Sequence, residues 1–440
     1  MLYSWFEMGH AVVGPARMAA DASRLMLSNP MNPFNHTAIA RHAAAACEVF
    51  ERTTRRYHKP SFGITSTVVD GRQVAVRERV VLDTPFCSIV RFERDVPAER
   101  SRDRRLLLVA PMSGHYASLL SGTVETFLPD HDVYITDWAD AREVPPSEGI
   151  FDLDDYVDLM RQTFTLFGGD VHVFAVCQPS VPVLAATALM EAAGDSNVPR
   201  SLMLAGGPVD TRISPTAVNR LAQERGTEWF RRNVISTVPW PNVGFGRSVY
   251  PGFLQLTGFM TMNLDRHVTA HKDLFRHLVE GDGDSVDKHK SFYDVYLAVM
   301  DLTAEFCLQT IDSGFVRHEL PRGEMRHRDM KVDLTAIRTP GLMTIEGEKD
   351  DITGVGQCAA AHALCSGIPD SRKLHYECPG VGHYGVFNGS RFRNEIAPRM
   401  AAFMRQNEGG GKSAHSGSGF QGKSGEGHGA DAFSFGSWLQ

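Results

Sequence analysis

The feature that most constrains this chain is a cysteine between an apolar strand-like segment and an apolar helix-like segment. Cys177 follows residues 172–176 and precedes residues 181–190, with Ala175 two residues before it and Pro179 two residues after it. A reactive side chain on a sharp turn between a strand and a helix forms a nucleophile elbow, usually written G-x-S-x-G. Ala175 meets the need for a small residue, and a proline costs little in the first turn of a helix, where its missing N–H would be unpaired.

Strand-like and helix-like segments alternate on both sides of this turn. Strands are predicted at 106–110, 132–136, 171–176, 201–207, 341–347 and 373–377, and helices at 117–127, 152–167, 181–190 and 391–405. Such alternation predicts a mostly parallel sheet flanked by helices on both faces. Together with the elbow, it predicts the α/β-hydrolase fold.

The same pattern divides the 440 residues into regions. We expect residues 1–100 to form an amino-terminal region whose helix and strand pair lead into the sheet. Residues 101–210 and 336–405 form the predicted core. Residues 211–335 are too many for an irregular loop and predict a largely helical inserted cap. Residues 406–440 are rich in glycine and serine and predict a disordered tail.

Composition excludes several classes of protein. A formal net charge of −7 argues against a nucleic-acid partner, and no apolar run is long enough to span a bilayer. The seven cysteines have neither metal-ligand nor disulfide-framework spacing. The amino terminus lacks the basic start of a secretory signal. We therefore expect a cytoplasmic protein with free thiols, no metal and no other cofactor.

The candidate catalytic residues follow from the chemistry of a thiol. A cysteine nucleophile needs a base, usually a histidine oriented by a carboxylate, and this fold presents the three in the order nucleophile, acid, histidine. Two acids, Asp350 and Asp351, follow one predicted strand, and His383 follows the last one in a glycine-rich turn. The candidates are Cys177, Asp350 and His383, with Asp351 as the alternative acid.

Acyl transfer also needs donors for the oxyanion of its tetrahedral intermediate. The backbone N–H of Gln178, the residue after the nucleophile, is one expected donor. The second is expected from Met112 or Ser113, in the loop after the first buried strand. Three further side chains are expected near the pocket: His115, Tyr116 and Tyr384.

Several motifs carry a resemblance to a known family. They are Pro30-Met31-Asn32-Pro33, Pro111-Met112-Ser113-Gly114-His115, Thr136-Asp137-Trp138, Val176-Cys177-Gln178-Pro179 and Gly380-Val381-Gly382-His383-Tyr384-Gly385. With these motifs the chain resembles the intracellular polyhydroxyalkanoate (poly-3-hydroxybutyrate) depolymerases of bacteria, over nearly all of its length up to about residue 405. A cysteine at the elbow is itself typical of that family.

The resemblance implies a triad of Cys177, Asp350 and His383 that cleaves the ester bonds of short-chain storage polyester granules. Water, or coenzyme A, would release the acyl group from the cysteine. Two alternatives stay open: a polyhydroxyalkanoate synthase-like acyltransferase, and a granule-binding protein without activity. The apolar segment 249–260 either offers a surface to the polymer or forms a buried cap helix.

Overall fold

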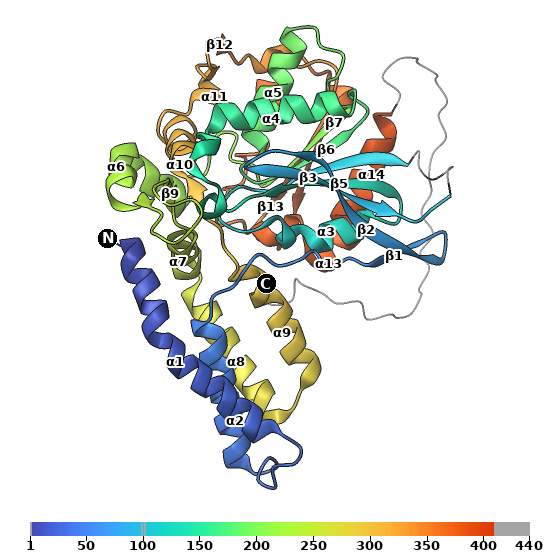
Figure 1. Cartoon of the computed structure of the whole chain (residues 1–440). Coiled ribbons are helices and arrows are strands. Elements are labelled where there is room, and N and C mark those ends of the chain that lie inside the picture. The colour runs from blue at the N-terminus through green and yellow to red at the C-terminus, as the bar shows by residue number, and fades with distance from the viewer. Residues whose placement is uncertain (1, 98–99, 101–102, 409–440) are drawn as a thin grey trace.

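A nine-stranded sheet lies at the centre of the chain (Figure 1), in a computed structural model that describes residues 2–97, 100 and 103–408. The strand order is β1-β2-β3-β5-β4-β6-β7-β13-β14. The bounds are β1 Ser66–Val69, β2 Arg72–Asp83, β3 Cys87–Arg94, β4 Arg104–Val109, β5 His131–Trp138, β6 His172–Val176, β7 Ser201–Ala205, β13 Gly341–Gly347 and β14 Lys373–Cys378.

The six strands from β5 to β14 run parallel, whereas β1, β2 and β3 pair antiparallel at one edge. The eight strands from β2 to β14 have the order of the α/β-hydrolase fold, in which the second strand, here β3, is antiparallel to its neighbours. The predicted fold class is therefore confirmed. Strands β6, β7 and β13 are buried along their whole length, because helices cover both faces of the sheet.

Helices lie on both sides of the sheet (Figure 1). They are α4 Leu153–Leu166 and α5 Ser180–Ala192 on one face, and α3 Ser121–Phe127, α13 Gly389–Arg391 and α14 Ala397–Gln406 on the other. Helix α4 begins with a reciprocal cap, in which Asp152 accepts from the N–H of Asp155 at 2.9 Å and Asp155 accepts from the N–H of Asp152 at 3.0 Å. The predicted disordered tail lies outside the described residues from 409 onward.

A long insertion separates β7 from β13. Its helices are α6 Ala217–Asn233, α7 Gly252–Met262, α8 Leu264–Glu280, α9 Gly283–Tyr296, α10 Ala304–Thr310 and α11 Glu319–Arg322. Its short strands are β8 Ser236–Thr237, β9 Ser248–Tyr250, β10 Leu302–Thr303, β11 Arg326–His327 and β12 Met330–Lys331. Across the described residues, no helix is both long enough and apolar enough to cross a membrane.

Two amino-terminal helices extend this insertion into a projecting arm (Figure 1). Helix α1 spans Leu2–Ser28 and α2 spans Ala38–Thr54, and α2 packs on α8. Ion pairs bind α2 to α9, with Lys290 Nζ 2.8 Å from Glu48 Oε1 and Arg52 Nη2 2.5 Å from Asp294 Oδ1. The helix predicted in the amino-terminal region therefore packs on the insertion, while β1–β3 join the sheet.

A buried pair of acids ties the arm and the insertion to the core. The Tyr3 hydroxyl on α1 donates to Asp301 Oδ2 at 2.6 Å, and the N–H of Gly252, at the start of α7, donates to Asp301 Oδ1 at 2.8 Å. The N–H of Asp301 donates to Asp140 Oδ1 at 3.0 Å. Burial, with the nearby Asp140 charge, raises the pKa of Asp301 to about 7. The folded protein therefore retains a proton at this pair below about pH 7.

This pair predicts a pH dependence of the free energy of unfolding. An unfolded aspartic acid titrates near a pKa of about 3.9, so between about pH 4 and pH 7 the folded state binds the extra proton. The proton on Asp301 stabilises the folded state fully below the pKa that Asp301 has in the unfolded chain. This stabilisation is lost as pH rises through the pKa of Asp301 in the folded protein. We expect Asp301→Asn, which keeps the shape of the side chain, to remove on the order of 2 kcal/mol of that pH dependence. Denaturant unfolding of both proteins from pH 5 to pH 8 measures it, and identical slopes would contradict it.

Candidate active site

Cys177 lies in the sharp turn between β6 and α5. Its φ is +65°, in the left-handed region that a residue with a side chain adopts only under strain. The Cys177 N–H donates to the carbonyl oxygen of Ala205 on β7 at 2.7 Å, and the Cys177 carbonyl accepts from the N–H of Ser180 at 3.1 Å. These bonds hold the strained turn in place, and strain of this kind is typical of a nucleophile elbow.

The remaining cysteines differ from Cys177 in exposure. Cys177 and Cys47 are half-buried, whereas five are buried: Cys87, Cys307, Cys358, Cys365 and Cys378. Burial raises the pKa of each of these five thiols. The five therefore stay protonated and poorly reactive near neutral pH.

His383 and Asp350 meet at the carboxyl end of the sheet. His383 begins the single turn that follows β14, and its Nδ1 lies 2.7 Å from Asp350 Oδ2. The other oxygen of Asp350 accepts from the backbone N–H groups of Ile352, at 2.9 Å, and Thr353, at 2.8 Å. Three donors thus fix the orientation of this carboxylate, and it in turn fixes the imidazole.

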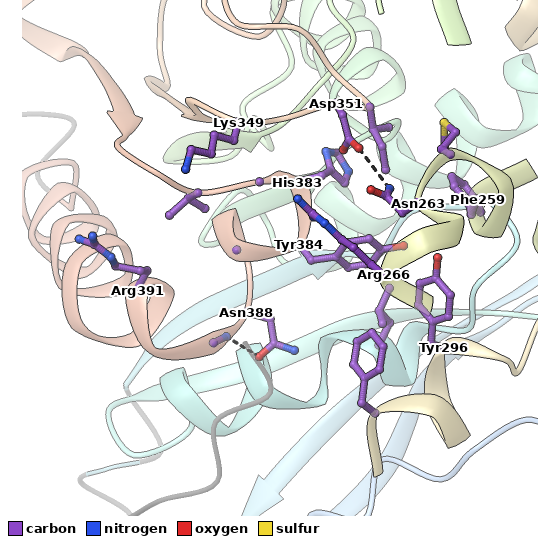
Figure 2. A pocket seen from close by; sticks show the side chains of 18 of the residues that line it. Phe259, Asn263, Arg266, Tyr296, Lys349, Asp351, His383, Tyr384, Asn388 and Arg391 are labelled. Carbon is purple, nitrogen blue, oxygen red and sulfur yellow. Dashed lines mark hydrogen bonds between the residues drawn. The ribbon is translucent and has the colours of Figure 1, made fainter. Parts of the chain in front are cut away.

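The neighbouring acid has a different partner. The side-chain amide of Asn263, on the insertion, donates to Asp351 Oδ2 at 3.2 Å, and Figure 2 shows this bond across a small hollow. Of the two acids left open by the sequence, Asp350 is therefore the one that hydrogen-bonds His383.

Two opposing effects act on the His383 imidazole. Burial lowers its pKa, but the charges of Asp350 and Cys177 and hydrogen bonds to both side chains outweigh burial and raise the pKa well above its ordinary value. Because Nδ1 faces Asp350, Nε2 is the ring nitrogen left for the Cys177 side chain. The structure thus places Cys177 and His383 at the same cavity, with Asp350 hydrogen-bonded to the imidazole.

Gly206 packs directly beneath this series and allows a sharp test. A Cβ built there lies 3.0 Å from His383 Cε1 and 3.3 Å from Asp350 Oδ2. We expect Gly206→Ala to displace the imidazole and lower kcat/KM for an ester by roughly 10- to 100-fold. Gly194→Ala is the matched control, because Gly194 also has a positive φ but has open space around its Cβ position. If both variants lose the same activity, backbone strain rather than displacement of His383 is responsible.

A cavity of about 380 Å³ lies over the elbow. Met112, Ser113 and Gln178 line it beside Cys177, as does His383. In the part of the chain that the structure describes, the backbone N–H groups of Met112, Ser113 and Gln178 donate to no protein acceptor. The residues expected to supply an oxyanion hole therefore lie around the cavity with their N–H groups available.

The insertion supplies most of the remaining wall. Apolar side chains from α6, α7 and α10 dominate it: Leu221, Phe230, Phe259, Met262 and Phe306. Part of the apolar segment 249–260 therefore lines this cavity, in helix α7. Sequence patterns alone did not identify the α6 and α10 residues, because an apolar residue on a cap helix has the same signature whether it faces a core or a cavity.

The three side chains expected near the pocket take different places. His115 and Tyr384 line the cavity. Burial lowers the pKa of His115 to about 4, so its imidazole is neutral at pH 7. Tyr116 is not among the lining residues, because its buried hydroxyl donates to Asp140 Oδ2 at 3.2 Å. The expectation for Tyr116 is corrected: it belongs to the buried acid pair described above.

A second, smaller hollow of about 80 Å³ is also lined in part by His383 (Figure 2). Arg266, Lys349 and Arg391 contribute cationic side chains to its lining, and Asp351 contributes a carboxylate. Within the described residues, no three histidine, cysteine or acidic side chains cluster in a way that could hold a metal ion.

One family model matches the chain at residues 206–408, with the description "PHB de-polymerase C-terminus". This part of the chain is similar to the carboxyl-terminal part of the PHB depolymerases. The match includes the insertion, Asp350 and His383, and it begins after Cys177. No curated protein matches the sequence.

Several solved structures have a similar backbone at low sequence identity. A putative lipase from Acinetobacter baumannii is 12% identical over 75% of this chain and 93% of that chain, with a TM-score of 0.37. A thermophilic esterase from Thermogutta terrifontis is 11% identical over 79% and 98%, with a TM-score of 0.38. The 2-hydroxy-6-oxo-6-phenylhexa-2,4-dienoate hydrolase from a Rhodococcus species is 10% identical over 76% and 99%, with a TM-score of 0.40. The fold of this chain is defined by its own strand order.

Proposed function

We propose that this protein cleaves the ester bonds of a short-chain 3-hydroxyacyl polyester, such as poly-3-hydroxybutyrate, through an acyl group bound to Cys177. The observation that carries the proposal is the hydrogen-bonded pair of His383 and Asp350 beside a strained elbow cysteine. The PHB depolymerase family match over residues 206–408 supports the substrate class. Amorphous storage granules inside the cell are the proposed natural form of the substrate.

The first half-reaction forms a thioester. The Cys177 sulfur attacks the ester carbonyl, and its proton passes to Nε2 of His383. Asp350 stabilises the resulting imidazolium through the 2.7 Å bond to Nδ1. The carbon–oxygen bond then breaks, and the leaving hydroxyl takes the proton from Nε2. The polymer is released as an alcohol end, and the acyl group stays on sulfur.

The developing oxyanion needs donors that are free before the reaction. In this proposal the N–H of Gln178 and that of Met112 or Ser113 supply them. Removal of one such donor typically costs about 100- to 1,000-fold in rate.

The cavity suits an uncharged aliphatic chain. Its wall beyond the elbow is formed by Leu221, Phe230, Phe259 and Met262, which carry no charge. Two buried polar groups stand out against that wall: in the described residues, the Gln178 side-chain amide and Nε2 of His115 have no protein hydrogen-bond partner. Ester oxygens of a bound chain are suitable partners for the amide.

The second half-reaction removes the acyl group from Cys177. Water, activated by His383, gives a free 3-hydroxy acid. Coenzyme A is a second candidate acceptor in this proposal, because its thiol can exchange with the thioester on Cys177. Attack by its thiol would instead give an acyl thioester.

One assay tests the proposal and its alternatives. Purified protein is incubated with amorphous poly-3-hydroxybutyrate particles, with and without coenzyme A, and the products are identified by mass spectrometry. Free 3-hydroxy acids are expected without coenzyme A, and acyl thioesters in its presence if it is the acceptor. Polymer made from 3-hydroxybutyryl-coenzyme A would favour a synthase-like acyltransferase. Particle binding with no product from either substrate would leave a non-catalytic granule-binding protein.

A further inference from the structure

Large apolar side chains are unusually exposed along α1 and the turn that follows it. Within the described residues, those on α1, on the turn that follows it or in the first turn of α2 are Leu2, Trp5, Met8, Val12, Met18, Leu25, Met26, Met31, Phe34 and Ile39. Exposed fractions reach 73% at Val12 and 88% at Met31. Apolar patches of this extent on a protein surface mark sites of interaction.

The outer face of α1 carries no charge. Its exposed positions recur every three or four residues, which places them on one side of a helix: Trp5, Met8, Val12, Pro15, Ala19, Ala22 and Met26. We call these seven residues the outer face of α1. Met18 and Leu25 flank this stripe, so the exposed apolar surface is broader than the narrow seam of a two-stranded coiled coil.

The charges of α1 are engaged on its other side. Glu7 pairs with Arg56, whose Nη2 lies 2.6 Å from Oε2, and Arg17 donates to the carbonyl oxygen of Thr54 at 2.8 Å. Arg24 bonds Asp21 at 2.7 Å and contacts Glu48 of α2 at 3.1 Å. Of the four charged residues of the helix, Glu7 is thus paired with a residue that follows α2, and the other three contact α2 or pair with a residue that does.

The amino-terminal end of α1 is packed against a wall of the catalytic cavity. The rings of Phe6 and Phe253 stack with centroids 3.9 Å apart, and Tyr3 meets Phe253 edge-on at 5.6 Å. Phe253 belongs to α7, and the same helix contributes Phe259 and Met262 to the cavity. A surface bound by the outer face of α1 is therefore connected to the cavity through helix α7.

We propose that the outer face of α1 docks the protein on the surface of an amorphous, uncharged aliphatic polyester. This rests on the proposed function, which requires the enzyme to work on an insoluble polymer. An uncharged face matches an uncharged polymer, because binding would not remove water from any charged side chain that lacks a partner on the polymer. Helices that lie on anionic membranes carry lysine and arginine on the polar side of the interface. Helix α1 has no lysine, and its two arginines, Arg17 and Arg24, are engaged on its α2 side.

The test introduces charge on the outer face without touching the cavity. The double variant Met8→Glu/Val12→Glu is compared with Val80→Glu/Leu166→Glu, which adds the same charge at exposed apolar positions on β2 and α4. Both are made in a Cys177→Ala background for co-sedimentation with poly-3-hydroxybutyrate particles, so that the polymer stays intact. Both are also made in the native background to measure turnover of a soluble short-chain ester.

We expect Met8→Glu/Val12→Glu to weaken particle binding at least about tenfold, since it places two charges where two large apolar side chains would be buried. Soluble-ester turnover should be unchanged, and the control variant should behave like the native protein.

Unchanged particle binding would overturn the proposal. A native dimer that becomes a monomer in the variant, with particle binding kept, would assign the face to a second copy of the chain. Equal loss of binding to phosphatidylcholine vesicles would assign it to lipid. Lack of any ester turnover in the native protein would refute the proposed function instead.

Discussion

Cys177→Ala is expected to lower kcat/KM for ester cleavage by on the order of 10⁴-fold or more, because loss of the nucleophile leaves only binding and oxyanion stabilisation. The variant should fold normally, since Cys177 is only half-buried and alanine is small. Initial rates on a soluble short-chain ester, with release of the alcohol followed spectroscopically, give the effect directly. The same loss is expected on polymer particles.

Cys47→Ala is the matched control for this experiment. Cys47 is the other half-buried thiol, and it lies on α2 in the arm, away from the catalytic cavity. Its replacement should leave kcat/KM within about twofold of the native value, as for a surface substitution away from the reacting atoms. If Cys177→Ala retains more than a tenth of the native activity, another group must form the covalent bond to the acyl group.

The second large effect separates the two adjacent acids. Asp350→Asn is expected to reduce kcat by roughly 10³- to 10⁴-fold, because an amide no longer holds the imidazole in the required tautomer or stabilises its charged form. Asp351→Asn should change kcat on a soluble ester by less than about threefold, since Asp351 bonds Asn263 and not His383. Steady-state kinetics of the two variants, with thermal unfolding to verify folding, is the measurement. Larger damage from Asp351→Asn would reverse the assignment of the acid.

Much of the site could be predicted because it depends on local chemistry. The elbow required a strand, a tight turn and a helix within a short stretch, and the sequence around Cys177 contains all three. The partners were expected at the ends of later strands, where the fold places them. The choice between Asp350 and Asp351 was beyond sequence patterns, because it depends on Asn263 and on the N–H groups of Ile352 and Thr353.

The arm was harder to predict for a different reason. Helix α1 contains two glycines and Pro15, residues that weaken any helical pattern read from sequence. Its inner side is stabilised by contacts with residues distant in the chain, such as Phe253 and Asp301. Tyr116 was misjudged for the same kind of reason, since its partner Asp140 lies on another loop.

The proposed reaction depends on an acyl group that is carried by the Cys177 sulfur. The most direct measurement is an acid-quenched single turnover with a short 3-hydroxybutyrate oligomer ester, followed by peptide mass spectrometry. We predict one 3-hydroxyacyl group on the peptide that contains Cys177, absent in Cys177→Ala and removed by neutral hydroxylamine, as a thioester requires. An acyl group on any other residue, or full turnover with no covalent intermediate at Cys177, would contradict the account.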